Sequence, residues 1–250
     1  MLTAKRHALI IDLLKQKHLV TIQELVDLTS ASESTIRRDL RELESHQHLI
    51  RVHGGATSKH SAFQELTYPE KSIYHVDAKK QIAKFAASLI SDHDCIYLDA
   101  GTTNYEMISH LADRQITVVT NGLTHLDALN QFNIKSYLLG GAVKHTTRAL
   151  IGVGALKALE RYHFDKVFIG ANAIDLNFGY STPDPEEAAV KRAAIAQGEL
   201  SFVIADHSKF NERRFAKIVD LNQATLITDA IEQNQHKQFQ EKTTIKVVST

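Results

Sequence analysis

The stretch from Ser32 to Ala56, SESTIRRDLRELESHQHLIRVHGGA, constrains the fold more than any other part of this 250-residue chain. At about 100° per residue, Ile36, Leu40 and Leu43 fall in one narrow sector of a helix. The opposite side carries only donors, namely Ser34, Arg37, Arg38, Arg41 and Ser45. Ser32 is a good N-cap, so a helix is predicted to follow it and to end near residue 45.

Two further helices are predicted before this one. Apolar residues recur at helical spacing over residues 3–16, and Thr21 followed by Glu24 fits a capping box for a helix that begins near Ile22. Residues 29–31 form a short turn before Ser32. A helix with donors on its exposed face, packed on two others through a tight turn, is typical of a helix-turn-helix protein that reads the major groove. The alternative is a solvated helix face without a partner.

The residues after the third helix favour the DNA-binding interpretation. Residues 49–52 form a predicted strand, and Gly54–Gly55 form the turn of a hairpin, or wing, whose Arg51 and His53 can reach the phosphate backbone or the minor groove. The predicted DNA-binding residues are Ser34, Thr35, Arg37, Arg38, Arg41, Arg51, His53 and Gly54.

The amino-acid composition limits which other classes of protein this chain can belong to. The 29 basic and 29 acidic residues balance, so a nucleic-acid surface must be a local patch. A single cysteine, Cys95, excludes an internal disulfide and fits a reducing cytoplasm. The longest run without a charge, 115–126, is too short to span a bilayer. The histidines are scattered and no nucleotide or hydrolase motif is present, so we expect no metal, no cofactor and a soluble cytoplasmic protein.

The remainder of the chain is predicted to be an α/β domain. Residues 58–76 are expected to be an exposed connector, and Asp77 is expected to cap the helix that follows. Short apolar runs then alternate with helical stretches, which predicts a parallel sheet. Polar turns follow those runs, at the sheet edge where open α/β folds bind ligands.

These turns and one helix supply the candidate ligand-binding residues. The turns contribute Asp99, Gly101, Thr102, Thr103, Asn121, Gly122, Gly140, Gly141, Asp206 and Lys209, and the helix contributes Glu187 and Lys191. Backbone amides and lysines suit an anion, and carboxylates suit sugar hydroxyls. Each feature also has a plain interpretation, as a βα turn, a solvated lysine or a surface i,i+4 pair.

The first sixty residues resemble the DNA-binding domain of the DeoR family of bacterial sugar-metabolism repressors. The resemblance is carried by Arg6, by Ser-x-x-Thr-Ile-Arg-Arg-Asp-Leu at 32–40, and by the RVHGGA wing at 51–56. The family usually closes the third helix with glycine, so here Gln47 or His48 is expected to adopt a left-handed conformation. Asn211 likewise stands where the family has glycine.

The resemblance extends from Tyr74 to the C-terminus, over motifs that contain all the candidate ligand-binding residues. It implies a winged helix-turn-helix domain at 1–57, a linker at 58–76, and an effector and oligomerisation domain at 77–250 that is similar in fold to sugar-phosphate isomerases. The second domain looks similar to fructose-operon repressors of Gram-positive bacteria, which implies fructose 1-phosphate as effector and a dimer or tetramer on operator DNA.

Two other functions remain open from the sequence. One is a sugar-phosphate isomerase with an appended DNA-binding domain, whose acid–base groups would be Asp99, Glu187, Lys191 and Asp206 if they converge. The other is a non-specific, architectural DNA-binding protein, against which the neutral overall charge argues.

Overall fold

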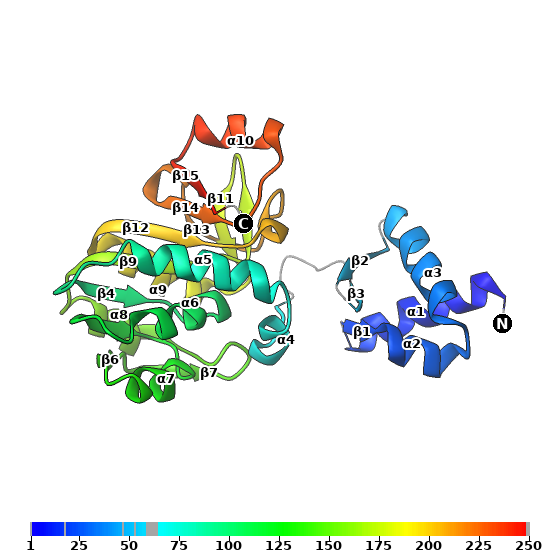
Figure 1. Cartoon of the computed structure of the whole chain (residues 1–250), viewed down its shortest axis with the longest axis horizontal. Coiled ribbons are helices and arrows are strands. Elements are labelled where there is room, and N and C mark those ends of the chain that lie inside the picture. The colour runs from blue at the N-terminus through cyan, green and yellow to red at the C-terminus, as the bar shows by residue number, and fades with distance from the viewer. Residues whose placement is uncertain (1, 18, 47, 53, 59–64, 249–250) are drawn as a thin grey trace. The chain divides into compact units, whose positions relative to one another are not determined.

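The computed structural model describes residues 2–17, 19–46, 48–52, 54–58 and 65–248. The chain divides into two compact units, Met1–Ser61 and Ala62–Thr250, each with its own core (Figure 1). No helix in the described ranges has the length and apolar character that crossing a membrane requires.

The first unit is a three-helix bundle with a small antiparallel sheet. Its elements are α1 (Thr3–Lys17), β1 (Leu19–Thr21), α2 (Ile22–Thr29), α3 (Glu33–Ser45), β2 (Leu49–Val52) and β3 (Gly55–Ser58), with strand order β1-β3-β2. The predicted capping box of α2 is present, since Thr21 and Glu24 bond reciprocally. Ser32 caps α3, whose Ile36, Leu40 and Leu43 are buried as the wheel predicts.

Two details of this unit differ from the sequence prediction. Strand β1 was not expected; it pairs with β3 so closely that a Cβ on Gly55 would lie 2.0 Å from the Val20 carbonyl oxygen. Of the two residues expected in a left-handed conformation after α3, Gln47 lies outside the described residues. His48 is not left-handed, and its N–H donates to the Leu43 carbonyl at 2.9 Å.

The second unit is built on a seven-stranded sheet in the order β15-β14-β12-β9-β4-β5-β6. All neighbouring strands are parallel. The strands are β4 (Cys95–Leu98), β5 (Thr117–Thr120), β6 (Lys135–Leu138), β9 (Phe164–Gly170), β12 (Gly198–Ile204), β14 (Thr225–Thr228) and β15 (Ile245–Val247). The chain starts at β4, builds outward to β6, and returns to the other side of β4 with β9. The order therefore reverses between β4 and β9, and such a switch point is where doubly wound sheets bind ligands.

Helices cover both faces of this sheet. One apolar cluster packs under α5 (Val76–Ser88), α6 (Thr102–Met107), the 3-10 turn Ile108–Leu111 and α7 (His125–Gln131). The other packs under α8 (Gly152–Leu159), α9 (Pro185–Ala196) and α10 (Gln233–Gln240). The predicted fold class, a helix-turn-helix unit followed by a parallel α/β unit, is confirmed.

Smaller elements decorate the carboxyl edge of the sheet. They are α4 (Tyr68–Ser72), the hairpin β7 (Ala142–Lys144) and β8 (Ala149–Ile151), the 3-10 turn His207–Lys209, and an antiparallel sheet of β10 (Ala173–Asp175), β11 (Gly179–Thr182) and β13 (Ala216–Val219). A further 3-10 turn, Leu221–Gln223, directly precedes β14. The sequence signals did not predict these, because each element is short.

The predicted connector at 58–76 is wrong for most of its described part. Ser58 ends β3, whereas residues 65–76 lie in the second unit and contain α4 and the start of α5. Buried ion pairs of Glu65 hold this segment, and weak apolar periodicity does not reveal them. The cap of α5 is His75, with φ +48°, and Asp77 lies within the first turn.

Candidate functional site

The exposed face of α3 presents the predicted DNA-binding side chains. Arg38 and Arg41 are exposed, and no carboxylate of the described residues pairs with either. Ser34 and Thr35 lie at the start of the helix, where both hydroxyls contact the Ser32 hydroxyl, at 3.0 and 2.9 Å. The exposed face of α3 thus carries hydroxyl groups at its N-terminal end and two guanidinium groups in its middle.

The other two predicted arginines are engaged by neighbouring acids. Arg37 pairs with Glu33 one turn earlier, with both side chains more than half exposed. Arg51 on β2 pairs with Glu44 at 2.7 Å, which fastens the wing to α3. Gly54 forms the tip of the wing with φ +80°, while His53 lies outside the described residues.

A buried ion pair that the sequence analysis missed sets the position of α3. The Arg6 guanidinium on α1 donates to both carboxylate oxygens of Asp39, with 2.9 Å between Nη2 and Oδ1. Asp39 is 1% exposed, although it was not among the residues predicted to face the core. Burial alone would raise the pKa of Asp39, but the hydrogen bonds and charge of Arg6 hold it below its ordinary value.

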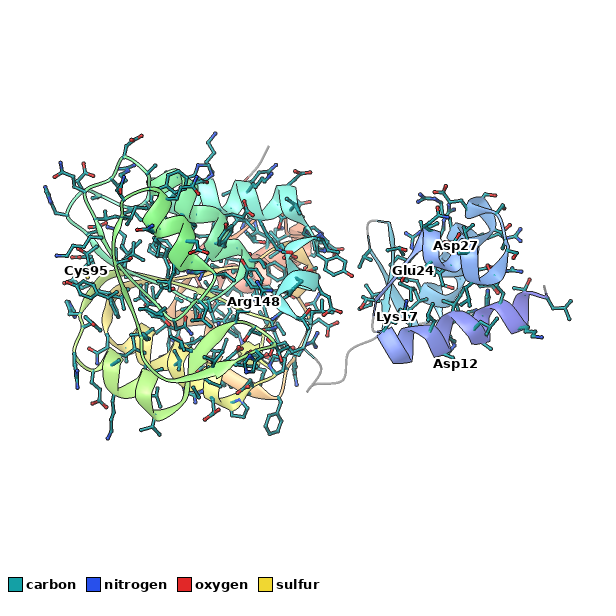
Figure 2. The ribbon with its side chains drawn as sticks, turned by 90° about the horizontal axis from the view of Figure 1, so that it is seen from below. Asp12, Lys17, Glu24, Asp27, Cys95 and Arg148 are labelled. Atoms are coloured by element: carbon teal, nitrogen blue, oxygen red, sulfur yellow. The ribbon has the colours of Figure 1, made fainter. Side chains whose placement is uncertain are left out.

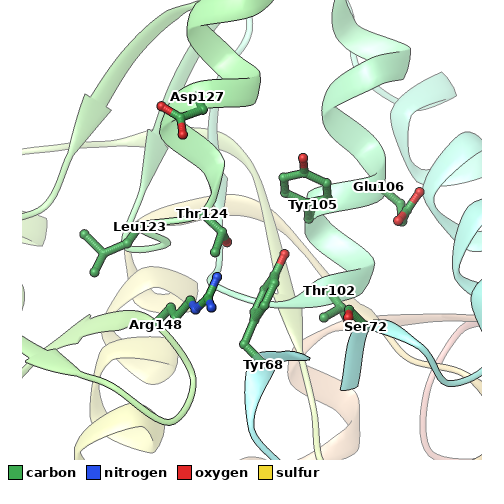
Figure 3. A pocket seen from close by; sticks show the side chains of 9 residues that line it. All are labelled: Tyr68, Ser72, Thr102, Tyr105, Glu106, Leu123, Thr124, Asp127 and Arg148. Atoms are coloured by element: carbon green, nitrogen blue, oxygen red, sulfur yellow. The ribbon is translucent and has the colours of Figure 1, made fainter. Parts of the chain in front are cut away.

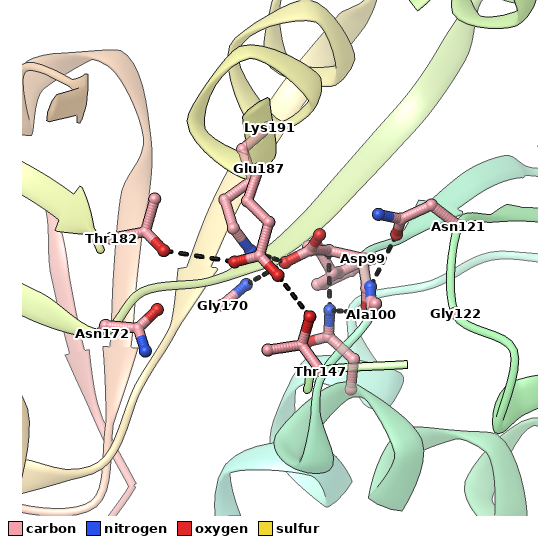
Figure 4. Close-up of polar contacts among 12 residues, drawn as sticks. Asp99, Ala100, Asn121, Gly122, Thr147, Gly170, Asn172, Thr182, Glu187 and Lys191 are labelled. Atoms are coloured by element: carbon pink, nitrogen blue, oxygen red, sulfur yellow. Dashed lines mark hydrogen bonds and ion pairs between the residues drawn. The ribbon is translucent and has the colours of Figure 1, made fainter. Parts of the chain in front are cut away.

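In the second unit, Asp99 lies at the centre of a buried polar cluster at the switch point. It follows β4, accepts a hydrogen bond from the Gly170 N–H at 3.0 Å, and forms an ion pair with Lys191 of α9 (Figure 4). All of these lie at the carboxyl edge of the sheet. Burial raises the pKa of the Asp99 carboxyl, and the charge of Lys191 opposes that shift.

Glu187, one turn before Lys191, is also buried in this cluster. Its carboxylate accepts hydrogen bonds from Thr147 and from Thr182, the latter at 3.3 Å, and lies 3.3 Å from Lys144 Nζ. Glu187 and Lys191 therefore do not form the surface i,i+4 pair considered from the sequence. Each instead faces a partner that is distant in the chain.

The glycine-containing turns line the same edge. Asn121 accepts from the Ala100 N–H at 2.7 Å and ties the turn after β5 to the turn after β4. A Cβ on Gly101 or Gly140 would meet no atom within 4 Å, so the space beside both backbones is open. Gly122 instead packs against the buried His125 ring, and Gly141 has φ +139° with its α-carbon against β8. Thr102 is buried at the start of α6, and Thr103 is half-buried.

Asp206 and Lys209 form a second polar cluster after β12. The Asp206 carboxylate accepts from the Ser208 backbone at 3.0 Å, and Lys209 Nζ lies 4.0 Å away. Burial alone would raise the pKa of Asp206, but the Lys209 charge and the Ser208 hydrogen bonds hold it at about 2. Asn211, just beyond, is left-handed with φ +59°, as the resemblance suggested.

One group of side chains near Asp206 has the spacing of metal ligands. The ligand atoms of His75, Asp206 and His207 lie within 4.8 Å of one another. The sequence analysis expected no metal and did not consider this set. The Lys209 ammonium opposes a cation there, because it already faces the Asp206 carboxylate.

A pocket of about 530 Å³ opens beside Thr102, between α4, α6, α7 and the hairpin β7–β8 (Figure 3). Arg148 and Tyr68 form one wall, and Tyr105 and Thr124 stand opposite. Sequence reasoning missed every lining residue except Thr102. The signal available was the polar stretch TTR at 146–148, which lies between β7 and β8.

Comparisons with known proteins agree with this architecture. Residues 6–62 match the DeoR-like helix-turn-helix domain, and residues 74–230 match the DeoR C terminal sensor domain. The chain is 49% identical to the uncharacterized HTH-type transcriptional regulator FruR of Bacillus subtilis, over 99% of both chains. It is 32% identical to a lactose phosphotransferase system repressor of Staphylococcus aureus, over 94% of this chain and 95% of that one.

Among solved structures, ribose 5-phosphate isomerase A of Methanocaldococcus jannaschii matches 54% of each chain at 18% identity and a TM-score of 0.41. That likeness is too low to carry an argument about activity. The matched families and the curated relatives are DNA-binding regulators, so the isomerase alternative is not supported. The chain belongs to the DeoR family of transcriptional regulators, with an N-terminal DNA-binding unit and a C-terminal sensor unit.

Proposed function

We propose that this regulator represses a fructose-utilisation operon and that a phosphorylated sugar, such as fructose 1-phosphate, controls its affinity for the operator. The DNA-binding part rests on one observation, the pair of exposed and unengaged guanidinium groups of Arg38 and Arg41 on α3. On a helix that enters the major groove, such groups bind guanine edges bidentately or contact phosphates. The remaining predicted DNA-binding residues belong to this proposal.

The effector part rests on the buried polar cluster at the switch point of the sheet. The carboxylates of Asp99, Glu187 and Asp206 are acceptors for sugar hydroxyls, and the open backbones of Gly101 and Gly140 permit close approach. We include the other predicted ligand residues in this proposal. Fructose is favoured because a relative that is 49% identical carries the name FruR.

The switch requires that the sugar phosphate bind the DNA-competent and DNA-incompetent states with different affinities. We propose a cytoplasmic homodimer or homotetramer that presents two copies of α3 to a pseudo-palindromic operator. In a dimer, the spacing of the two recognition helices must match the spacing of the two half-sites. A ligand bound to the sensor units could therefore alter operator affinity by changing that spacing.

Fluorescence anisotropy with labelled upstream DNA and random DNA tests both parts at fixed salt. Arg38→Ala is expected to weaken operator binding by roughly 1–3 kcal/mol, whereas the exposed Arg161→Ala in the second unit is the matched control and leaves it unchanged. Operator affinity that is equal in the two variants would remove the assignment of α3 as the reading helix.

The same assay identifies the effector. Fructose 1-phosphate, fructose 6-phosphate, tagatose 6-phosphate and free fructose are titrated into the operator complex. An effect of fructose 1-phosphate alone supports the proposal. If a different sugar phosphate changes operator binding, the protein is still a repressor but its effector is not fructose 1-phosphate.

A further inference from the structure

The pocket beside Thr102 contains a cation with no acidic partner. Arg148 is exposed, and no described carboxylate lies within ion-pair distance of its guanidinium. Its backbone is left-handed, with φ +55°, and its guanidinium lies 5.5 Å from the centre of the Tyr68 ring. A left-handed arginine costs free energy, so a strained and preoriented cation at a pocket wall indicates a binding role.

The lysines that the sequence suggested as phosphate partners are differently placed. Lys191 is buried in its ion pair with Asp99, and Lys209 lies 4.0 Å from the Asp206 carboxylate. Binding a phosphate at either lysine would bring a dianion next to an existing carboxylate. Among these three cations, Arg148 alone can bind an anion without breaking an existing pair with a carboxylate.

The other walls of the pocket fit the sugar part of such a ligand. Thr102, Tyr105 and Thr124 offer hydroxyl groups, and Glu106 and Asp127 offer carboxylates (Figure 3). Carboxylates accept hydrogen bonds from sugar hydroxyls, and their negative charge keeps the phosphate at the Arg148 end. A volume of about 530 Å³ is within the range of small-molecule sites.

The Tyr68 side of the pocket belongs to the segment that directly follows the undescribed residues 59–64. This segment, residues 65–72, is fastened to the hairpin that carries Arg148. The Tyr68 N–H donates to the Thr146 carbonyl at 2.8 Å, and Glu65 pairs with Lys144 of β7. Lys144 also lies 3.3 Å from Glu187, so it connects Glu65 of this segment to the buried polar cluster around Asp99.

We infer that Arg148, held against Tyr68, binds the phosphate group of the effector, and that segment 65–72 is the part of the sensor that the bound ligand stabilises. This inference rests on the proposed function, since it assumes that the effector is a phosphorylated sugar. A ligand on Arg148 touches Tyr68, so its binding energy stabilises the packing of residues 65–72 within the second unit.

The test uses the full chain and two probes, inorganic phosphate and fructose 1-phosphate. Isothermal titration measures affinity, and amide hydrogen exchange measures protection of residues 65–72. Arg148→Gln is expected to weaken the binding of both probes about 10- to 100-fold and to abolish the ligand-dependent protection. Lys209→Gln tests the competing phosphate partner and is expected to weaken binding less than Arg148→Gln does. Arg161→Gln, at an exposed arginine of the second unit, is the matched control and is expected to retain phosphate binding. The thermal midpoint of the sensor unit reports that the variants are folded.

Tyr68→Phe keeps the ring and is expected to keep the affinity, whereas Tyr68→Ala is expected to weaken it. If Arg148→Gln binds both probes like the wild type, or if Lys209→Gln alone loses them, the inference is overturned while the proposed function stands. If inorganic phosphate binds through Arg148 but fructose 1-phosphate does not bind, the inference stands and the sugar is wrong. If neither probe binds the wild type, the inference and the proposed effector class both fall.

Discussion

Asp39→Ala is predicted to unfold the DNA-binding unit while leaving the sensor unit intact. The substitution removes a carboxylate that is 1% exposed and leaves the 5% exposed Arg6 side chain without its two charge-assisted hydrogen bonds to Asp39. Breaking a buried pair in this way costs about 3–5 kcal/mol. A unit of about 60 residues has a folding free energy on the order of 3–9 kcal/mol, so most of its stability would be lost.

Amide hydrogen exchange measures this loss separately in each unit. Protection over α1 and α3 is expected to fall by about two to three orders of magnitude, whereas protection over the parallel sheet stays unchanged. The control is Glu33→Ala, which removes the exposed pair with Arg37 that lies one helical turn away (52% and 60% exposed). That change is expected to cost less than about 1 kcal/mol.

A double substitution tests the reasoning itself. Arg6→Met combined with Asp39→Leu replaces the pair with apolar side chains of similar size, and this exchange is often neutral or stabilising. The double variant is therefore expected to recover most of the protection that Asp39→Ala loses. If the two variants are equally destabilised, the cost does not come from breaking the charged pair, and our account of the pair is wrong.

Three further predictions concern the sensor unit. Gly141→Ala is expected to lower the thermal midpoint in calorimetry, because φ is +139° and the new Cβ would lie 2.5 Å from the Ile151 carbonyl oxygen; an unchanged midpoint would contradict that geometry. Gly101→Ala is expected to keep the midpoint but weaken effector binding in titration, since its Cβ meets only open space; unaltered affinity would show that no ligand comes close to this backbone. Glu65→Gln is expected to reduce the loss of unfolding free energy that occurs as the pH is lowered. Burial raises the pKa of Glu65, but the ion pairs with Lys71 and Lys144 outweigh it and lower that pKa from 4.5 to about 2, so the stabilisation is present above pH 4.5 and is lost as the pH falls towards 2. A variant whose stability falls with pH as the wild type's does would refute this.

The features that were predictable from sequence are those whose physical cause lies within a few residues. A capping box spans four residues, and the buried face of α3 follows from helical spacing. The short apolar runs that alternate with helical stretches form strands of the sheet. A central strand such as β4 is apolar because it is buried on both faces, whereas β6 lies at the edge and alternates between exposed and half-buried residues. Exposed local pairs such as Lys17 with Glu24, 2.9 Å apart, also lie close in the chain (Figure 2).

The features that escaped prediction depend on contacts between distant segments. Asp39 meets Arg6 across 33 positions, and Lys191 meets Asp99 across 92. Glu65 sits in a stretch without periodicity, and its partner Lys144 is 79 positions away. Arg148 was not predicted as a ligand residue, because its left-handed backbone and its contact with Tyr68 appear only once α4 has packed on the hairpin.

The strand order of the parallel sheet has a consequence for how the protein avoids association through its own backbone. In the described part of the chain, β6 and β15 are the edge strands of the sheet, since each pairs on one side only. Their outer backbone N–H and C=O groups are free to hydrogen-bond with a strand of another molecule. Both strands are short, with four and three residues, and each carries a lysine, Lys135 or Lys246. A charge on a short edge strand makes growth of the sheet by a neighbouring molecule unfavourable, which protects the protein from aggregation through its sheet edges.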